Sequence, residues 1–182
     1  REKPWAIDEP DEFGYTPIHY AVRDSNFEAL EHLIIAKANI HAHGGISDKT
    51  LLMSAVWYRN EAMVRRLLDH NECRRDLDRR SDRGRTALYF AAERSFPEGV
   101  RLLLHAGASM SKPDQFGLTP LHSLAGNENS DQQAVDETVQ LLKDHRADIE
   151  AKERFGYTPL MQAIALRNLT VLRVHVDAGA SL

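Results

Sequence analysis

A short segment recurs five times along the 182-residue chain, and this repetition limits the possible folds more than any other feature. Each copy is a turn-forming sequence that leads into a threonine. The five threonines are Thr16, Thr50, Thr86, Thr119 and Thr158. Their spacings are therefore 34, 36, 33 and 39 residues. A period of this length is typical of a solenoid, in which each repeat is one supersecondary unit stacked on the next.

Each copy predicts a tight turn and then two helices. In the first copy, Gly14 permits the positive φ that such a turn needs. Pro17 fits the first turn of a helix, because its missing N–H would have no helical partner there. A second helix is predicted from apolar residues that recur at helical spacing. In this copy they are Phe27, Leu30, Leu33 and Ile34. The other four copies repeat this order of elements.

The five copies resemble the ankyrin repeat, a 33-residue unit with the pattern T-P-L-H-x-A. The first and fourth copies are closest to that pattern. The second departs most, with Asp48 in place of glycine and Leu51 in place of proline, so we expect its turn to be distorted. The resemblance implies an all-α ankyrin-repeat solenoid of roughly ten helices with projecting β-turn or hairpin loops. We expect one domain over residues 1–182, with repeats at 11–43, 44–80, 81–113, 114–152 and 153–182 after the tail of a preceding repeat at 1–10.

Two polar insertions interrupt the period, and the last helix is unusually apolar. The fourth copy has extra residues at Glu128–Gln133, and Glu72–Arg80 lengthens the link between the second and third copies. Polar insertions in repeats normally form loops on one face. Terminal repeats need a polar outer face, whereas the last helix carries Val171, Leu172, Val174 and Val176. We therefore expect this chain to be a segment of a longer protein.

The sequence contains no catalytic motif. We find no phosphate-binding glycine loop, nucleophile elbow or H-E-x-x-H metalloprotease motif. His41 and His43 form an H-x-H pair, but no cysteine or third histidine lies close enough in sequence to complete a metal site. No enzyme activity, cofactor or metal is predicted. Cys73, the only cysteine, is expected to be an ordinary surface thiol, with a reactive thiol as the alternative because nearby arginines lower thiol pKa.

Composition says more about location than about function. The formal net charge is −4, which does not favour binding to nucleic acid or to a membrane surface. No apolar run approaches the length of a membrane-spanning helix, and no secretory signal is visible. A single cysteine fits a reducing compartment. We expect an intracellular protein, cytoplasmic or nuclear, that is monomeric as this segment and does not insert into membranes.

An arginine-rich stretch is the most unusual local feature. Six arginines fall between positions 74 and 85, interleaved with three aspartates. They are Arg74, Arg75, Arg79, Arg80, Arg83 and Arg85. The stretch has three interpretations. It can be a solvated, partly self-paired loop, or a docking site for an acidic peptide or phosphate, since guanidinium groups bind both. It can also be a nucleic-acid site, although such sites usually have a broader basic footprint.

The family resemblance implies that a protein partner binds at the turn tips and at the concave face of the first helices. These positions are rich in aromatic and arginine side chains, which are typical of interface centres. The candidate partner-binding residues are Phe13, Tyr15, Trp57, Tyr58, Arg83, Arg85, Arg94, Phe116, Leu118, Phe155 and Tyr157. The three phenylalanines can instead pack against neighbouring turns. Trp57 and Tyr58 are favoured for contact, because the other repeats lack aromatics there.

The predicted function is therefore that of a protein–protein interaction scaffold. An acidic segment with an apolar anchor is the favoured ligand, because arginines bind carboxylates and aromatics offer a large contact area. The alternative is a regulatory or targeting segment of a larger enzyme whose catalytic domain lies outside these residues.

Overall fold

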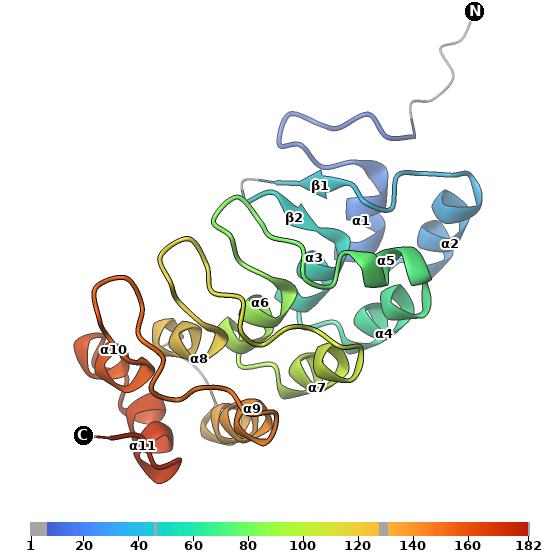
Figure 1. Cartoon of the computed structure of the whole chain (residues 1–182). Helices are drawn as coiled ribbons and strands as arrows, with labels where there is room; N and C mark the ends of the chain where they lie inside the picture. Colours follow the sequence, from blue (N-terminus) through green and yellow to red (C-terminus); the bar gives the residue numbers. More distant parts are fainter. Residues whose placement is uncertain (1–6, 46, 128–130, 182) are drawn as a thin grey trace, which may run out of the picture.

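The computed structural model describes residues 7–45, 47–127 and 131–181 as a stack of helix pairs (Figure 1). The first helices of the pairs are α1 (Pro17–Arg23), α3 (Leu51–Trp57), α6 (Ala87–Glu93), α8 (Pro120–Ser123) and α10 (Pro159–Ala165). The second helices are α2 (Phe27–Ile35), α4 (Glu61–Asp69), α7 (Pro97–His105), α9 (Gln132–Asp144) and α11 (Leu169–Asp177). A short 3₁₀ helix, η1 (Leu124–Gly126), extends α8. The turns between pairs project from the same side of the stack (Figure 1). The predicted all-α solenoid is confirmed.

Each first helix begins directly after the repeated threonine, and in the second, third and fifth repeats the threonine hydroxyl caps it. Threonine is favoured at this position, where its side-chain oxygen accepts an otherwise unpaired backbone N–H. The Thr50 Oγ1 accepts from the Met53 N–H at 3.1 Å, and the Thr86 and Thr158 hydroxyls make the same bond at 3.2 and 3.3 Å. The strongest signal in the sequence is therefore a set of helix starts.

The histidines of the first and fourth copies support the same cap. His19 Nδ1 accepts from the Thr16 N–H at 3.2 Å, and His122 Nδ1 accepts from the Thr119 N–H at 3.2 Å. The proton of His122 must then lie on Nε2, which donates to the Tyr157 carbonyl of the next repeat at 2.9 Å. Burial lowers the pKa of both histidines below the usual value. Both are therefore neutral structural groups.

Side-chain acceptors hold the projecting turns. The Asp114 Oδ1 accepts from the N–H groups of Phe116 and Leu118 at 2.8 and 3.0 Å, and Glu153 makes the equivalent bonds in the last turn. The second turn differs: Asp48 takes the positive φ, at 49°, that glycine takes in the other turns. The expected distortion is a short hairpin of β1 (His43–Gly44) and β2 (Lys49–Thr50), with His43 paired to Thr50. Asp48 can adopt this conformation because aspartate tolerates the left-handed region better than most residues.

The apolar faces of both helix rows form one continuous core. Leu67, Leu103 and Leu142 occupy one position in α4, α7 and α9, and all three are fully buried. The same position in α11 is occupied by His175, which is also fully buried. None of the helices in the described ranges is long and apolar enough to cross a membrane.

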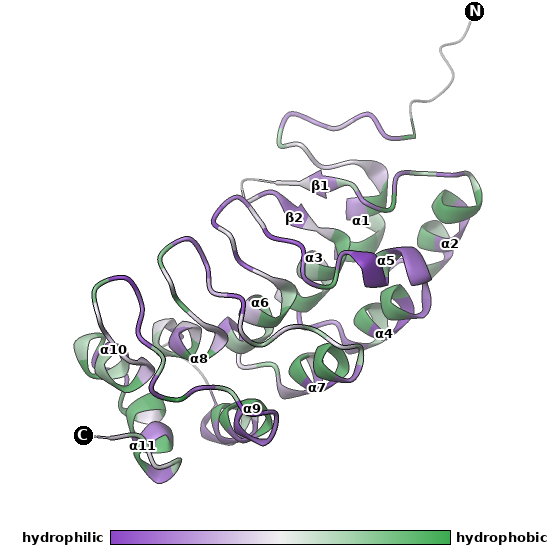
Figure 2. Ribbon diagram, viewed as in Figure 1, coloured by the Kyte–Doolittle hydropathy of each residue, from purple (hydrophilic) through white to green (hydrophobic). Residues whose placement is uncertain are grey.

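The link between the second and third repeats is more ordered than a polar loop. It contains the mainly hydrophilic helix α5 (Asn71–Arg75) (Figure 2). Cys73 of this helix and Leu77 beyond its end are buried in the core. Cys73 is only 2% exposed, and burial raises the pKa of its thiol to about 12. The prediction of a surface thiol is therefore wrong, because the apolar thiol side chain fills the core beneath an otherwise polar helix. Of the other insertion, residues 128–130 lie outside the described residues, and Gln132 already begins α9.

The last helix pair exposes side chains at positions that are buried in the earlier pairs. Met161 is 46% exposed, whereas Tyr89, at the same position in α6, is 2% exposed. Ile164 is 52% exposed, and its counterparts Val56 and Ala92 are fully buried. In α3 and α6 the next pair covers these positions. α10 therefore carries an apolar stacking face that no described element covers (Figure 2).

Candidate partner-binding site

The surface expected to bind a partner consists of the turn tips and the exposed ends of the first helices, and we call it the concave face. Trp57, the last residue of α3, lies on this face with its ring edge-on to Phe90 of α6, at a centroid distance of 5.8 Å. The Lys49 ammonium lies 4.1 Å from the centroid of the Trp57 ring, and the Arg94 guanidinium carbon lies 4.9 Å from it. Cations at this distance are attracted to the π face of the ring. We call Lys49, Trp57 and Arg94 the Trp57 cluster.

The two cations of the Trp57 cluster lie near carboxylates but form no close ion pair with a described residue. Among the described residues, neither Lys49 nor Arg94 forms an ion pair. Lys49 is half-buried, and this desolvation lowers the pKa of its ammonium group despite the nearby carboxylates of Glu93 and Asp82. A positive group that is partly desolvated and unpaired is a receptor for an incoming anion.

Arg85, also a candidate for partner contact, is half-buried, and its guanidinium contacts groups within the protein. Its NH1 lies 3.2 Å from Glu93 Oε1, and its Nε lies 3.7 Å from Asp114 Oδ2. Its guanidinium also lies 4.8 Å from the Tyr89 ring centroid. Burial raises the pKa of Glu93, and the neighbouring cations, Arg85 first, counter that shift. Arg85 therefore pairs with Glu93 at the end of α6 while part of its side chain stays exposed.

Tyr58 lies apart from Trp57 although the two are adjacent in sequence. Tyr58 is 48% exposed and borders a small hollow of about 60 Å³ together with Tyr15, Tyr20 and Arg23. The Arg23 guanidinium lies 4.4 Å from the Tyr20 ring centroid. Trp57 therefore faces the third repeat and Tyr58 faces the first. The two aromatic side chains of the expected pair therefore lie in different surroundings on the concave face.

The turn tips form a continuous row. The Gln115 N–H donates to the Arg83 carbonyl at 3.0 Å, and the Arg154 N–H donates to the Phe116 carbonyl at 2.9 Å, so adjacent tips are joined through their backbones. Tyr15, Arg85 and Leu118 are half-buried, whereas the other tip candidates, including Arg83, are exposed. The exposed aromatic tips are Phe13, Phe116, Phe155 and Tyr157. This exposure supports the contact interpretation of the phenylalanines over packing between turns.

Most of the arginine-rich stretch is occupied by contacts within the protein. The Arg74 Nε donates to the Leu68 carbonyl at 2.7 Å, Arg79 lies 3.6 Å from Asp76, and the Arg80 Nε donates to the Gly84 carbonyl at 3.0 Å. Arg75 and Arg83 are exposed and form no ion pair with any described residue. These contacts support the self-paired interpretation for most of the stretch.

The histidines of the H-x-H pair bind different carboxylates. His41 Nδ1 lies 2.7 Å from Asp76 Oδ2, while His43 Nδ1 lies 3.2 Å from Asp48 Oδ2. In the part of the chain that the structure describes, no group of three or more histidine, cysteine, aspartate or glutamate side chains could hold a metal ion. The pair therefore contributes to the hairpin and to the contact between the first two repeats.

Comparison with known proteins identifies the family. The model described as "Ankyrin repeats (3 copies)" matches residues 18–114. The chain belongs to the ankyrin repeat family. Human B-cell lymphoma 3 protein is 32% identical over 173 residues, which cover 88% of this chain and 35% of that protein. Human transient receptor potential cation channel subfamily A member 1 is 24% identical over 180 residues, covering 97% and 16%. Serine/threonine-protein kinase 12 of Arabidopsis thaliana is 31% identical over 99 residues, covering 54% and 20%.

This ankyrin repeat chain spans only 16% to 35% of the length of these three relatives. Ankyrin repeats generally mediate protein–protein interaction and form a non-catalytic module. Lys49 of the Trp57 cluster lies at a turn tip of the expected surface but is not among the candidate partner-binding residues chosen from the sequence. It reaches the ring only because the second ankyrin repeat has a paired hairpin, and the sequence signal for that hairpin was the missing glycine at position 48.

Proposed function

We propose that this ankyrin repeat chain binds a protein partner through its concave face, with the Trp57 cluster as the centre of contact. One observation carries the proposal. Two unpaired cations, Lys49 and Arg94, are held against one aromatic ring at the surface. Holding two like charges close together costs free energy that an anionic ligand would recover.

The chemistry of the cluster favours an acidic segment with an apolar anchor as the ligand. A partner carboxylate can bind between Lys49 and Arg94, where charge-assisted hydrogen bonds are strong. An adjacent apolar side chain can pack on the exposed part of Trp57 or against Tyr58, since aromatic side chains supply large contact area. Glu93 and Asp82 limit the positive potential to this small region, which disfavours the extended phosphate backbone of a nucleic acid.

The first experiment is to identify and measure the partner. Affinity capture with the parent chain, followed by mass spectrometry, supplies candidates whose affinity is then measured by titration calorimetry. We expect Lys49→Glu and Arg94→Glu each to weaken binding by roughly 10- to 100-fold, because a charge pair becomes a repulsion. Arg173→Glu is the matched control. Arg173 is exposed on α11, and Asp177 is its one ion-pair partner among the described residues, so this change should leave the affinity unaltered.

The measured affinities decide whether the Trp57 cluster is the contact. If both cluster variants stay folded and bind the partner as tightly as the parent, the cluster is not the binding site. If Arg173→Glu weakens binding as much as Arg94→Glu does, the effect is one of net charge, and the proposed location is wrong.

A second function is favoured by one comparison. The similarity to a serine/threonine-protein kinase is consistent with a regulatory or targeting segment of a larger enzyme. The sequence of the full-length protein discriminates the two. A catalytic motif outside these residues supports the regulatory function. That function also requires that the partner change the activity of the full-length enzyme differently in the Arg94→Glu variant.

A further inference from the structure

Side-chain acceptors link successive repeats along the flank where the second helices end. The Asp8 Oδ1 accepts from the Asn39 N–H at 2.7 Å, and the Asp78 Oδ1 accepts from the Ser109 N–H at 2.8 Å. Between the first and second repeats, the bond is the His41–Asp76 side-chain pair at 2.7 Å. At the last junction the Glu150 Oε1 accepts from the Ser181 N–H at 2.6 Å. Each bond joins equivalent positions of neighbouring repeats.

The junction between the third and fourth repeats lacks this link. The equivalent residues there are Ser111 and Asp148, and no hydrogen bond joins them. The Ser111 hydroxyl instead lies 3.3 Å from the Ser109 hydroxyl, and the Asp148 Oδ1 accepts from the Glu150 N–H at 2.9 Å. The Asp148 N–H has no hydrogen-bond partner within the described ranges. Where the other junctions have an aspartate, a glutamate or His41, this one has a serine, and its shorter side chain does not bridge the gap.

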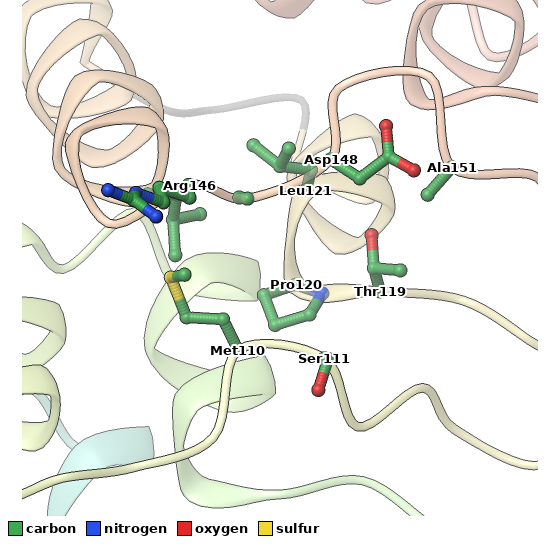
Figure 3. A pocket seen from close by; sticks show the side chains of 10 residues that line it. Met110, Ser111, Thr119, Pro120, Leu121, Arg146, Asp148 and Ala151 are labelled. Atoms are coloured by element: carbon green, nitrogen blue, oxygen red, sulfur yellow. The ribbon is translucent and has the colours of Figure 1, made fainter.

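A pocket of about 390 Å³ opens at this junction (Figure 3). Its lining is mostly apolar, with Met110, Pro120 and Leu121 contributed by the third and fourth repeats. Arg146 and Asp148 lie on opposite sides of the pocket (Figure 3). Arg146 is exposed and forms no ion pair with any described residue. The pocket therefore combines an apolar lining, a free backbone donor and an unpaired cation.

We propose that this pocket binds an apolar side chain from an acidic peptide segment of a partner protein. The volume accommodates a side chain the size of leucine or phenylalanine. A backbone carbonyl of the peptide then accepts from the Asp148 N–H in place of the missing side chain. A neutral acceptor fits this point better than a carboxylate, because the Asp148 carboxylate lies beside it. An acidic neighbour of the apolar residue pairs with Arg146.

This site is distinct from the concave face. It is built from the third and fourth repeats on the flank of the stack, whereas the Trp57 cluster is built from the second and third. Each site is tested separately, because variants of one leave the residues of the other unchanged.

The test is an NMR titration of the ¹⁵N-labelled chain with a synthetic probe. The probe is the acetylated and amidated pentapeptide Glu-Glu-Leu-Glu-Glu. We expect the amide signals of Ala147, Asp148 and Ala151 to shift on titration, with Asp148 moving downfield as its N–H gains an acceptor. Replacing the leucine of the probe by alanine, or its glutamates by lysines, should weaken binding at least about 10-fold.

Two variants separate this pocket from other binding modes. Ser111→Asp combined with Asp148→Asn recreates the Asp8–Asn39 pair, so it should close the junction, raise the melting temperature and abolish the shifts. Arg146→Glu leaves the pocket open and should weaken probe binding at least about 10-fold. The Lys49→Glu variant should bind the probe at this pocket as the parent does.

The proposal is overturned if millimolar probe leaves these three amides unmoved. It is also overturned if these three amides shift in the closed double variant and in Arg146→Glu at the same probe concentrations as in the parent. If the double variant does not fold, the test rests on Arg146→Glu: weaker probe binding at the pocket supports the proposal, and unchanged binding there overturns it.

Discussion

Replacing His175 by leucine should stabilise the protein. His175 is fully buried at a position that leucine occupies in α4, α7 and α9. Its Nδ1 donates to the Val171 carbonyl at 2.8 Å, but its Nε2 is buried without any hydrogen-bond partner. Burial lowers the pKa of the imidazole below the usual value. The side chain is therefore held neutral and only partly satisfied in an apolar environment.

The magnitude follows from the two nitrogens. Losing the bond from Nδ1 costs about 1 kcal/mol, whereas removing a buried, unpaired nitrogen recovers about 1–3 kcal/mol. Leucine also buries more apolar surface than imidazole, and its size matches the equivalent core positions. We expect the free energy of unfolding to rise by about 1–2 kcal/mol. For a chain of this length, each kcal/mol raises the melting temperature by roughly 2–4 °C.

The advantage of leucine should grow as the pH falls. The unfolded chain binds a proton at a histidine pKa near 6.5, while the native protein, whose His175 pKa is lowered, does not. Lowering the pH below about 6.5 therefore reduces the free energy of unfolding of the parent. The reduction is up to about 1.4 kcal/mol per pH unit for each such histidine. His19 and His122 act in the same direction and are unchanged in the variant.

Urea unfolding at pH 7 and pH 5 measures both effects, and hydrogen exchange at the amides of α11 locates them. His175→Gln is the control, because it keeps a polar group in the core and should not stabilise. A leucine variant that is less stable than the parent at pH 7 would refute the packing argument. A stability difference that does not grow between pH 7 and pH 5 would refute the titration argument.

Three further predictions test the surface, the core and the stack. Trp57→Ala should remain folded by thermal melting and weaken partner binding by roughly 30- to 1,000-fold in calorimetry, because it removes the platform for Lys49 and Arg94. Cys73 should react with a thiol reagent only after unfolding, because its thiol is buried with a raised pKa; fast labelling of the native chain would contradict its placement. Val56→Gln should cost more than about 2 kcal/mol in urea unfolding, whereas Ile164→Gln at the equivalent but exposed position should cost less than about 0.5 kcal/mol.

The sequence predicted those features that depend on residues close together in the chain. Thr86 and Thr158 cap their helices through N–H groups three residues later, and the Asp114 carboxylate holds a turn of neighbouring residues. Such local interactions repeat with the sequence, so the period reveals them. The helix pairs and their order were therefore accessible from the sequence alone.

The sequence could not predict contacts that depend on stacking. Arg85 lies at a turn tip in the sequence pattern, but stacking places its guanidinium beside Glu93 and Asp114, which belong to different turns and helices. Lys49 reaches Trp57 only through the hairpin of the second repeat. Cys73 was predicted to lie on the surface because its neighbours are charged, yet burial depends on the side of α5 that it occupies.

Some residues depart from the repeat pattern, and their solvent accessibility indicates whether the departure affects the fold or binding. His175 departs from leucine in the core, where no partner can reach it, so its effect is on stability alone. Ser111 departs from the carboxylate at its position and leaves a pocket that is open to a ligand. Trp57 introduces an aromatic ring at a surface position and gathers two cations on it. A departure from the repeat pattern that costs stability is expected mainly where function requires it. Ser111 and Trp57 are the two departures that lie at accessible surfaces beside cations without an ion pair among the described residues. Those two positions are therefore where loss of binding should be found without loss of the fold.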